Sequence, residues 1–184
     1  MNPTRRSAGP RRGMDDRIDR LRFELFDKKK HDRGSFDCGV EELTTYLKKT
    51  LGQHARKDVT RGYVLADSEG KIAGYITLSS SLLRVEVVPE GKGYSTRMPL
   101  PAALLGRLAV DLSFQRKGVG SRLLIEAFRL ALATSETIGT AVIEVDAKGQ
   151  SAKDFYSHFG FQSLVDDDHH MYIPMKTVRK ALNA

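Results

Sequence analysis

The 184-residue sequence contains a single cysteine, Cys38, so no disulfide can form within the chain. Nothing else in the composition points to an oxidising compartment. We therefore expect a cytoplasmic protein in which Cys38 is a small buried hydrophobic residue. Long apolar runs are missing too: a membrane span needs about 18 apolar residues, and Arg107 interrupts the longest candidate. We expect a soluble protein that does not insert into a membrane.

The sequence also lacks the two common nucleotide-binding fingerprints. No Gly-x-Gly-x-x-Gly motif follows a predicted strand. Gly34 and Gly39 have the spacing of a P-loop, but Val40 follows where that motif needs lysine. These absences argue against hydride transfer and nucleotide hydrolysis.

Acidic residues are missing from the first 13 positions, which hold four arginines. The chain has 30 basic and 23 acidic side chains, a formal charge of +7; without these arginines, 26 basic groups face the 23 acidic ones. We expect residues 1–19 to be a disordered basic arm that precedes one domain, residues 20–184. Two basic clusters remain as candidate contacts to nucleic-acid phosphates, or as solvated surface. Their members are Lys48, Lys49, Arg56 and Lys57, and then Arg84, Lys92 and Arg97.

Apolar periodicity predicts strands that alternate with helices. The expected strands are 21–26, 63–66, 72–78, 102–110, 141–145, 161–165 and 171–173. The expected helices are 41–52, 120–133, 151–159 and 175–182, and prolines and glycines make 89–101 irregular. Hairpins mixed with crossover helices predict a single α/β domain with a mixed, mostly antiparallel sheet and flanking helices.

The strand at 104–111 runs into a glycine-containing turn that opens a helix. Gly118 and Gly120 have no Cβ to block a ligand, so successive backbone N–H groups can point at phosphate oxygens. The following helix adds its unpaired first-turn N–H groups and the positive end of its dipole. The turn therefore predicts a pyrophosphate site, with Arg116 and Lys117 inside it.

Three segments together resemble the GNAT acetyltransferases: Leu-Gly-Arg-Leu-Ala-Val-Asp at 105–111, Gln115-Arg-Lys-Gly-Val-Gly120, and Phe155-Tyr-Ser-His-Phe-Gly-Phe161. Phe36-Asp-Cys-Gly39 and Val145-Asp-Ala147 are similar to the toxin subfamily that acetylates the amino group of aminoacyl-tRNA. The resemblance implies that acetyl-coenzyme A lies between two splayed strands, with a strand N–H polarising its thioester carbonyl. The implied cofactor contacts are Leu108, Ala109, Val110, Gln115, Arg116, Lys117, Gly118, Val119, Gly120, Ser121 and Phe155.

The same resemblance places Tyr156 near the sulfur of the cofactor. A phenol of pKa about 10 can protonate a departing thiolate of pKa about 8.5, so we predict that Tyr156 is the general acid. The alternative is that Tyr156 only packs with Phe155 and Phe159 in the core. No motif singles out a general base. Glu144 and Asp146 share one strand face and could act through water, or simply hydrogen-bond at the strand end.

A free α-amino group, with pKa about 7.7 to 8.0, needs less help from a base than a lysine does. Together with the resemblance to the toxin subfamily, this makes a translation-blocking toxin that acetylates aminoacyl-tRNA the leading hypothesis. The alternatives are an acetyltransferase for a small amine or a protein N-terminus, and a non-catalytic module that binds coenzyme A. The resemblance also implies a homodimer and a ribbon-helix-helix antitoxin. We assign no metal to residues 166–170, because adjacent side chains on an extended segment rarely bind one ion.

Overall fold

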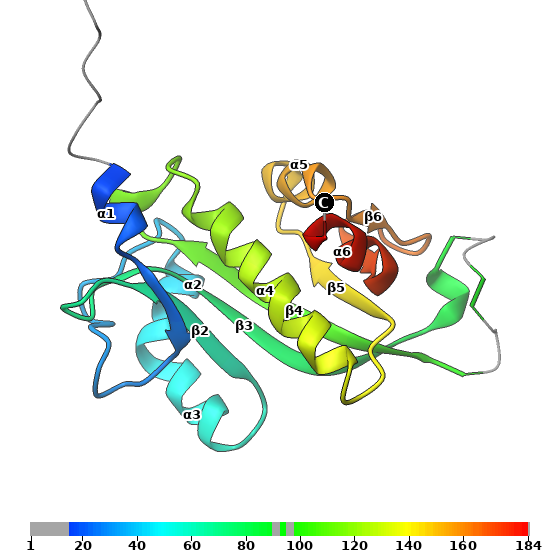
Figure 1. Cartoon of the computed structure of the whole chain (residues 1–184), viewed down its shortest axis with the longest axis horizontal. Helices are drawn as coiled ribbons and strands as arrows, with labels where there is room; N and C mark the ends of the chain where they lie inside the picture. Colours follow the sequence, from blue (N-terminus) through cyan, green and yellow to red (C-terminus); the bar gives the residue numbers. More distant parts are fainter. Residues whose placement is uncertain (1–14, 90–92, 95–97, 184) are drawn as a thin grey trace, which may run out of the picture.

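The computed structural model describes residues 15–89, 93–94 and 98–183. Within these ranges the chain forms a seven-stranded sheet of order β1-β2-β3-β4-β5-β7-β6 (Figure 1). The strands are β1 (Arg22–Leu25), β2 (Arg61–Ala66), β3 (Ile72–Leu83), β4 (Leu100–Val110), β5 (Val142–Asp146), β6 (Gln162–Ser163) and β7 (His170–Pro174). Neighbouring strands are antiparallel except β4 and β5, which are parallel. The predicted mixed, mostly antiparallel α/β fold is confirmed.

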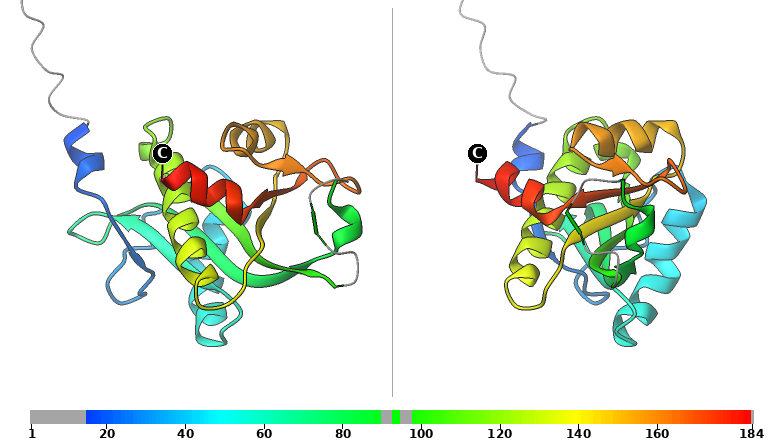
Figure 2. Two further views of the ribbon diagram at one scale, coloured as in Figure 1. Left: turned by 45° about the vertical axis from the view of Figure 1, so that its right-hand side comes forward. Right: turned by 90° about the vertical axis from the view of Figure 1, so that its right-hand side faces the viewer.

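Helices cover both faces of the sheet, as the edge-on view in Figure 2 shows. One face carries α4 (Val119–Ser135), α5 (Gln150–His158) and α6 (Met175–Leu182). The other carries a continuous helical segment made of α2 (Glu41–Thr45), the π-helix η1 (Tyr46–Thr50) and α3 (Leu51–Arg56). Three short helices complete the described chain: α1 (Asp15–Asp19) and the 3₁₀ turns η2 (Val85–Val87) and η3 (Leu112–Phe114).

Helical spacing of apolar residues explains both layers. Leu123, Leu124, Ala127, Phe128 and Ala131 form one buried stripe of α4 against the sheet. On the other face Leu47 and Leu51 are fully buried against β2. A Cβ at Gly62 of β2 would lie 2.6 Å from Leu51 Cδ2, so glycine allows this close approach. Each such leucine contributes about 1.5–3 kcal/mol by burial.

Two segments differ from the sequence prediction. Asp15–Asp19, expected to belong to the disordered arm, forms α1: Ile18 packs against the core, and Arg122 donates hydrogen bonds to the Ile18 and Leu21 carbonyls, both at 2.7 Å. The long β3–β4 hairpin also extends into the segment expected to be irregular. Leu82 faces Pro101 there, and the Pro101 carbonyl accepts from the Ala141 amide at 2.8 Å. Proline is tolerated because it lies at the beginning of β4.

The divergence of β4 and β5 determines where a ligand can enter. They pair over Ala102–Leu104 and Val142–Glu144, and beyond these residues they separate. Leu108 and Val110 of β4 lie on the α4 side of the sheet, whereas Glu144 shares the opposite face with its β7 partner Tyr172. The side chains next to the divergence therefore lie on both faces of the sheet.

Candidate active site

A cavity of about 570 Å³ lies where the end of β4, the beginning of α4 and α5 meet. Its lining residues are Leu108, Val110, Gln115, Arg116, Gly118, Gly120, Ser121, Lys148, Ser151, Ala152, Phe155 and Tyr156. The floor is apolar and comes from β4 and α5, while the rim is the turn before α4. One side of the cavity thus suits an acyl chain and the other an anion.

The turn before α4 presents backbone amides to this cavity. Arg116 and Gly118 both have positive φ, 58° and 80°, and Gly118 caps the helix in the left-handed conformation. The Arg122 amide donates to the Gly118 carbonyl at 3.0 Å, so the amides of residues 119–121 precede the first bond of the helix. These donors and the helix dipole make an anion-binding site, which fits the predicted pyrophosphate.

Side-chain hydrogen bonds hold this turn in place. Gln115 Nε2 donates to the Cys38 carbonyl at 2.9 Å and to the Val110 carbonyl at 3.0 Å. Asp111 accepts from the Asp37 amide at 3.0 Å. The turn is therefore tied to β4 and to the loop before α2. Cys38 itself is buried, as expected.

Tyr156 lies on α5 at the apolar end of the cavity and is 6% exposed. Its ring contacts Phe155 and Phe161, with centroid distances of 5.2 and 5.3 Å. Burial raises the pKa of the phenol well above 10, so it stays protonated at neutral pH. Among the described residues its hydroxyl has no hydrogen-bond partner, and a protonated, unpaired phenol at a cavity wall can donate to a ligand.

A second cavity, of about 380 Å³, lies on the opposite face of the sheet at the divergence of β4 and β5. Leu104 and Glu144, the last paired residues of the two strands, line it. Glu144 is 4% exposed, and its Oε2 lies 3.0 Å from His170 Nε2. Arg84 and Asp166 form an ion pair of 3.4 Å in the same lining. A molecule in this cavity would meet the separated strands from the side opposite the first cavity.

Comparison with known proteins agrees with this geometry. Residues 60–163 match the family described as "Acetyltransferase (GNAT) domain". The chain belongs to the GNAT acetyltransferases. A tRNA-acetylating toxin of Mycobacterium tuberculosis is 33% identical over 146 residues, 79% of this chain and 87% of the relative. A probable toxin TacT of Sinorhizobium fredii is 27% identical over 172 residues, 87% and 94% of the two chains.

Solved structures of GNAT toxins have the same fold. AtaT complexed with acetyl-methionyl-tRNAfMet superposes with a TM-score of 0.82 at 29% identity, covering 88% of this chain and 99% of AtaT. A tyrosine-to-phenylalanine variant of AtaT, bound to acetyl-CoA and the C-terminus of the antitoxin AtaR, gives 0.78 at 27% identity, covering 90% and 99%.

The structure of this GNAT domain brings most of the predicted cofactor residues to one cavity, but not all. Ala109 packs on the other face of the sheet because side chains alternate along β4. Val119 is buried against the core, and Lys117 donates to the Ser113 carbonyl at 2.5 Å. Only their backbone could therefore contribute to the cavity.

Sequence reasoning missed three lining residues of this GNAT domain, Lys148, Ser151 and Ala152. A signal was present. Gly149, with φ of 81°, precedes α5, and residues 151 and 152 lie one helical turn before the aromatic pair 155–156.

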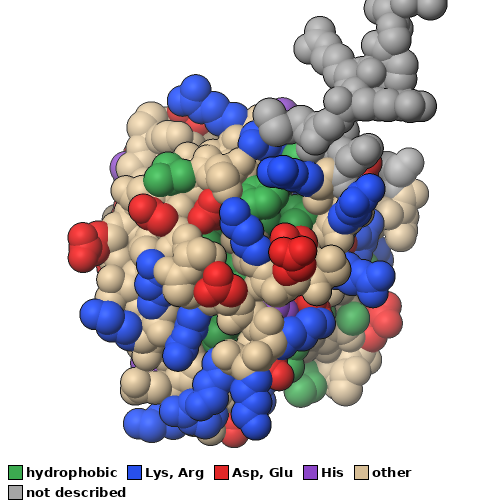
Figure 3. All heavy atoms as spheres, turned by 90° about the vertical axis from the view of Figure 1, so that its left-hand side faces the viewer, with side chains coloured by type: hydrophobic (Ala, Val, Ile, Leu, Met, Phe, Trp, Pro, Cys, Tyr) green, Lys and Arg blue, Asp and Glu red, His purple; other side chains and the backbone are tan. Residues whose placement is uncertain are grey.

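The predicted basic residues of this GNAT domain separate into two places. Lys48, Lys49 and Arg56 share a hollow of about 370 Å³ with Lys28 and Arg33, two residues that were not among the predicted contacts. Figure 3 shows Lys and Arg side chains gathered at the lower edge of the face over α3. Lys57 lies outside this lining, and Arg84 lies at the second cavity. Lys92 and Arg97 lie outside the described residues.

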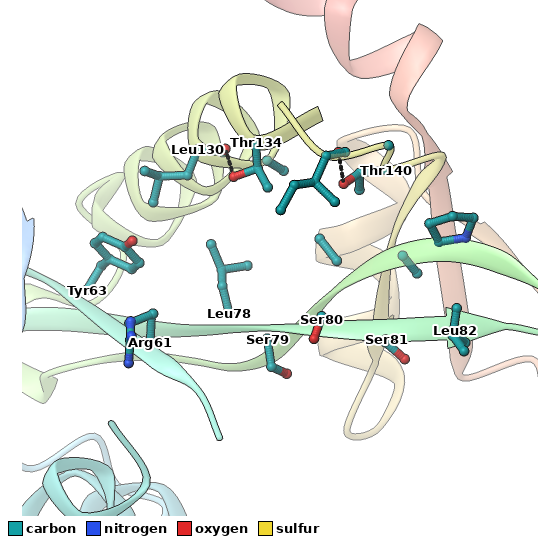
Figure 4. Close-up of a pocket in the computed structure, with 16 residues that line it drawn as sticks. Arg61, Tyr63, Leu78, Ser79, Ser80, Ser81, Leu82, Leu130, Thr134 and Thr140 are labelled. Carbon is teal, nitrogen blue, oxygen red and sulfur yellow. Dashed lines mark hydrogen bonds between the residues drawn. The ribbon is translucent and has the colours of Figure 1, made fainter. Parts of the chain in front are cut away.

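A larger, mostly apolar hollow of this GNAT domain, about 800 Å³, lies between the C-terminal half of α4 and the β3–β4 hairpin (Figure 4). Leu78, Leu130 and a run of serines at 79–81 line it. The hydroxyls of Thr134 and Thr140 donate to the Leu130 and Ile138 carbonyls. The glycine turn and Tyr156 are outside this lining, so size alone does not mark the active site.

The side chains at the acidic hairpin tip lie closer together than expected for adjacent residues of an extended segment. Ligand atoms of Asp167, Asp168 and His169 all lie within 4.8 Å of one another. Asp168 pairs with Lys153 of α5 at 2.6 Å and with His169 at 2.8 Å, and the Lys153 hydrogen bond contributes most to lowering its pKa. These contacts tie α5 to the hairpin.

In the part of the chain that the structure describes, no helix is long and apolar enough to cross a bilayer.

Proposed function

We propose that this GNAT domain transfers an acetyl group from acetyl-CoA to the α-amino group of aminoacyl-tRNA, and so acts as a translation-blocking toxin. The observation that carries the proposal is the similarity to AtaT, solved with acetyl-methionyl-tRNAfMet, over 88% of this chain. The relative named a tRNA-acetylating toxin, 33% identical, supports the same acceptor. An acetylated amine is an amide, which cannot attack a peptidyl ester.

The lining of the first cavity suits two parts of acetyl-CoA. The amides at the beginning of α4 and the Arg116 side chain would hold the pyrophosphate. Leu108, Val110 and Phe155 would contact the pantetheine arm. When bound, the cofactor supplies an activated acyl carbon and a thiolate leaving group.

Tyr156 is the proton donor in this proposal. The amine nitrogen forms a bond to the acyl carbon and loses a proton, the carbon–sulfur bond breaks, and the phenol gives its proton to the departing sulfur; the phenolate then takes a proton from water before the next turnover. Burial raises the pKa of Tyr156, so the phenol stays protonated throughout the neutral range and is a weaker acid than a free tyrosine; its proton must therefore move as the carbon–sulfur bond breaks. A backbone N–H of β4 would stabilise the charge on the carbonyl oxygen.

The second cavity is the proposed entrance for the amine. Its location on the opposite face leaves the first cavity free for the cofactor. The Glu144 carboxylate, oriented by His170 at 3.0 Å, would accept through water the proton that the amine loses. At least about half of an α-amino group of pKa about 7.7 to 8.0 is neutral at pH 8, so this assistance matters most at lower pH.

Several further assignments belong to the same proposal. Lys48, Lys49, Arg56, Lys57, Arg84, Lys92 and Arg97 are the proposed tRNA contacts. The protein would act in the cytoplasm, where charged tRNA is found, as a homodimer inhibited by a ribbon-helix-helix antitoxin. The AtaT structure that contains the C-terminus of the antitoxin AtaR supports an antitoxin partner.

A labelling experiment tests the proposed acceptor. The protein is incubated with acetyl-labelled acetyl-CoA and, separately, aminoacyl-tRNA, deacylated tRNA, peptides with free N-termini and polyamines. We expect label on aminoacyl-tRNA alone, released when the ester bond is hydrolysed. Transfer to peptides or polyamines with none to aminoacyl-tRNA would contradict the proposal.

A further inference from the structure

Arg107 of β4 lies beside the proposed active site, and no step of the proposed mechanism uses its side chain. It directly precedes Leu108, a lining residue of the cofactor cavity. A bulge sets its direction: Leu105 pairs with Leu78 and Arg107 with the adjacent Thr77, which leaves Gly106 as the extra residue. Arg107 therefore points to the α2–α3 face, away from α4, and stacks there on Tyr46.

Arg107 is also the next side chain after Leu104 along this face of β4. Leu104 lines the second cavity and pairs with Ser79, two residues from Thr77 on β3. At about 3.4 Å per residue, this spacing places the origin of the Arg107 side chain roughly 7 Å along the sheet from that of Leu104. Arg107 is therefore the next side chain of β4 beyond the proposed entrance for the amine, although it does not itself line that cavity.

Tyr46 provides a rigid base for the guanidinium. Arg107 Cζ lies 3.6 Å from the centroid of the Tyr46 ring, and the Tyr46 hydroxyl is 3.0 Å from His54 Nδ1. Tyr46 is itself buried and begins the π-helix η1, an irregularity that is often found at functional sites. Stacking uses the face of the guanidinium and leaves its N–H edge free to bind. Among the described residues this edge has no hydrogen-bond acceptor.

Two lysines follow Tyr46 on the same helical segment. These residues, Lys48 and Lys49, lie in the same π-helix and line the basic hollow with Lys28, Arg33 and Arg56. No acidic side chain is among the lining residues of that hollow. Figure 3 shows Lys and Arg side chains gathered on the surface over α3, and Tyr46, on which Arg107 stacks, belongs to the same continuous helical segment.

We infer that Arg107, stacked on Tyr46, binds a backbone phosphate at the acceptor end of the tRNA, and that the Lys48–Lys49 hollow holds phosphates further along the same strand. The inference rests on the proposed function. A planar guanidinium with a free edge matches the two oxygens of a phosphate. It would hold the terminal nucleotides so that the aminoacyl group enters the second cavity.

Two measurements on Arg107→Gln and Arg107→Lys test the inference. The first is the salt dependence of binding to deacylated tRNA, followed by fluorescence anisotropy. The second is kcat and KM for aminoacyl-tRNA and for a phosphate-free acceptor, methionine amide. Arg129→Gln is the matched control, because Arg129 is an exposed arginine of α4, on the other face of the sheet.

For Arg107→Gln we expect tRNA affinity to fall about tenfold, as for loss of one charged hydrogen bond. The slope of log K against log salt should decrease by about 0.7, the value for one single-strand phosphate. KM for methionine amide should not change. Arg107→Lys should keep the slope and lose part of the affinity, because lysine keeps the charge but not the planar edge.

Wild-type affinity and slope in Arg107→Gln would overturn the inference. Equal losses with both acceptors would overturn it too, because they would show a purely structural role. The binding arm does not depend on turnover, so the inference is tested even if aminoacyl-tRNA is not acetylated. That result would contradict the proposed function alone.

Discussion

Replacing Tyr156 by phenylalanine distinguishes the two roles considered for this residue, a proton donor in catalysis and an aromatic residue of the core. The ring is held by Phe155 at 5.2 Å and Phe161 at 5.3 Å, and phenylalanine keeps both contacts. The hydroxyl has no hydrogen-bond partner among the described residues, so its removal leaves no partner unsatisfied. We therefore expect the free energy of unfolding to change by less than about 1 kcal/mol.

The effect on catalysis should be far larger. A positioned general acid contributes about 10²- to 10⁴-fold to the rate, which is about 2.7–5.5 kcal/mol of transition-state stabilisation. Among the described residues the phenol makes no hydrogen bond to the turn that we propose for the pyrophosphate, so affinity for acetyl-CoA should stay within about twofold of wild type. The loss should therefore be in kcat.

Three measurements check this prediction on the same protein preparation. Thermal unfolding measures stability, calorimetry measures acetyl-CoA affinity, and single-turnover transfer to aminoacyl-tRNA measures the chemical step. Phe161→Leu is the matched control, because it changes an aromatic that packs on Tyr156 but does not line the cofactor cavity and carries no proton donor. Turnover at the wild-type rate in Tyr156→Phe would refute the reasoning. So would a rate loss fully explained by a lower melting temperature.

Three further predictions follow from other parts of the site. Gly118→Ala should lower the free energy of unfolding by about 1–2 kcal/mol, which is about 2–8 °C in melting temperature. The cause is backbone strain at a φ of 80°, because an added Cβ would meet nothing within 4 Å. Unchanged stability would contradict this argument. Glu144→Gln should lower kcat/KM most below about pH 7.7, where the α-amino group is protonated, and a loss independent of pH would argue against proton transfer. Burial raises the pKa values of Tyr75 and Tyr156 above the value of 10.0 for an unperturbed tyrosine. Their contribution to stability is therefore complete below about pH 10 and is lost at higher pH, as the unfolded chain releases protons that the folded chain keeps. Alkaline titration of unfolding should show a decline that is about 1.4 kcal/mol per pH unit shallower in Tyr156→Phe, and equal slopes would contradict this assignment.

The sequence predicts those parts of the fold that local patterns specify. The α4 stripe from Leu123 to Ala131 repeats at helical spacing and is found as expected. The turn at Gly118 was predicted to bind an anion from its glycines and from the helix that follows it. Patterns of this kind need no knowledge of distant contacts.

The parts that could not be predicted depend on long-range contacts. Helix α1 needs Arg122, about a hundred residues away, to bind the Ile18 and Leu21 carbonyls. Simple alternation along β4 would put Arg107 on the same face as Leu105, and only the bulge against β3 turns it toward Tyr46. The Glu144–His170 contact likewise depends on pairing between β5 and β7.

Mass spectrometry of the aminoacyl group tests the central claim most directly. Aminoacyl-tRNA is incubated with acetyl-CoA and the protein, digested with ribonuclease, and the 3′ aminoacyl-adenosine is analysed. The account predicts the mass of one added acetyl group on the amino-acid nitrogen, with wild-type protein and not with Tyr156→Phe. An unmodified aminoacyl-adenosine, with acetyl-CoA bound and the protein folded, would contradict it.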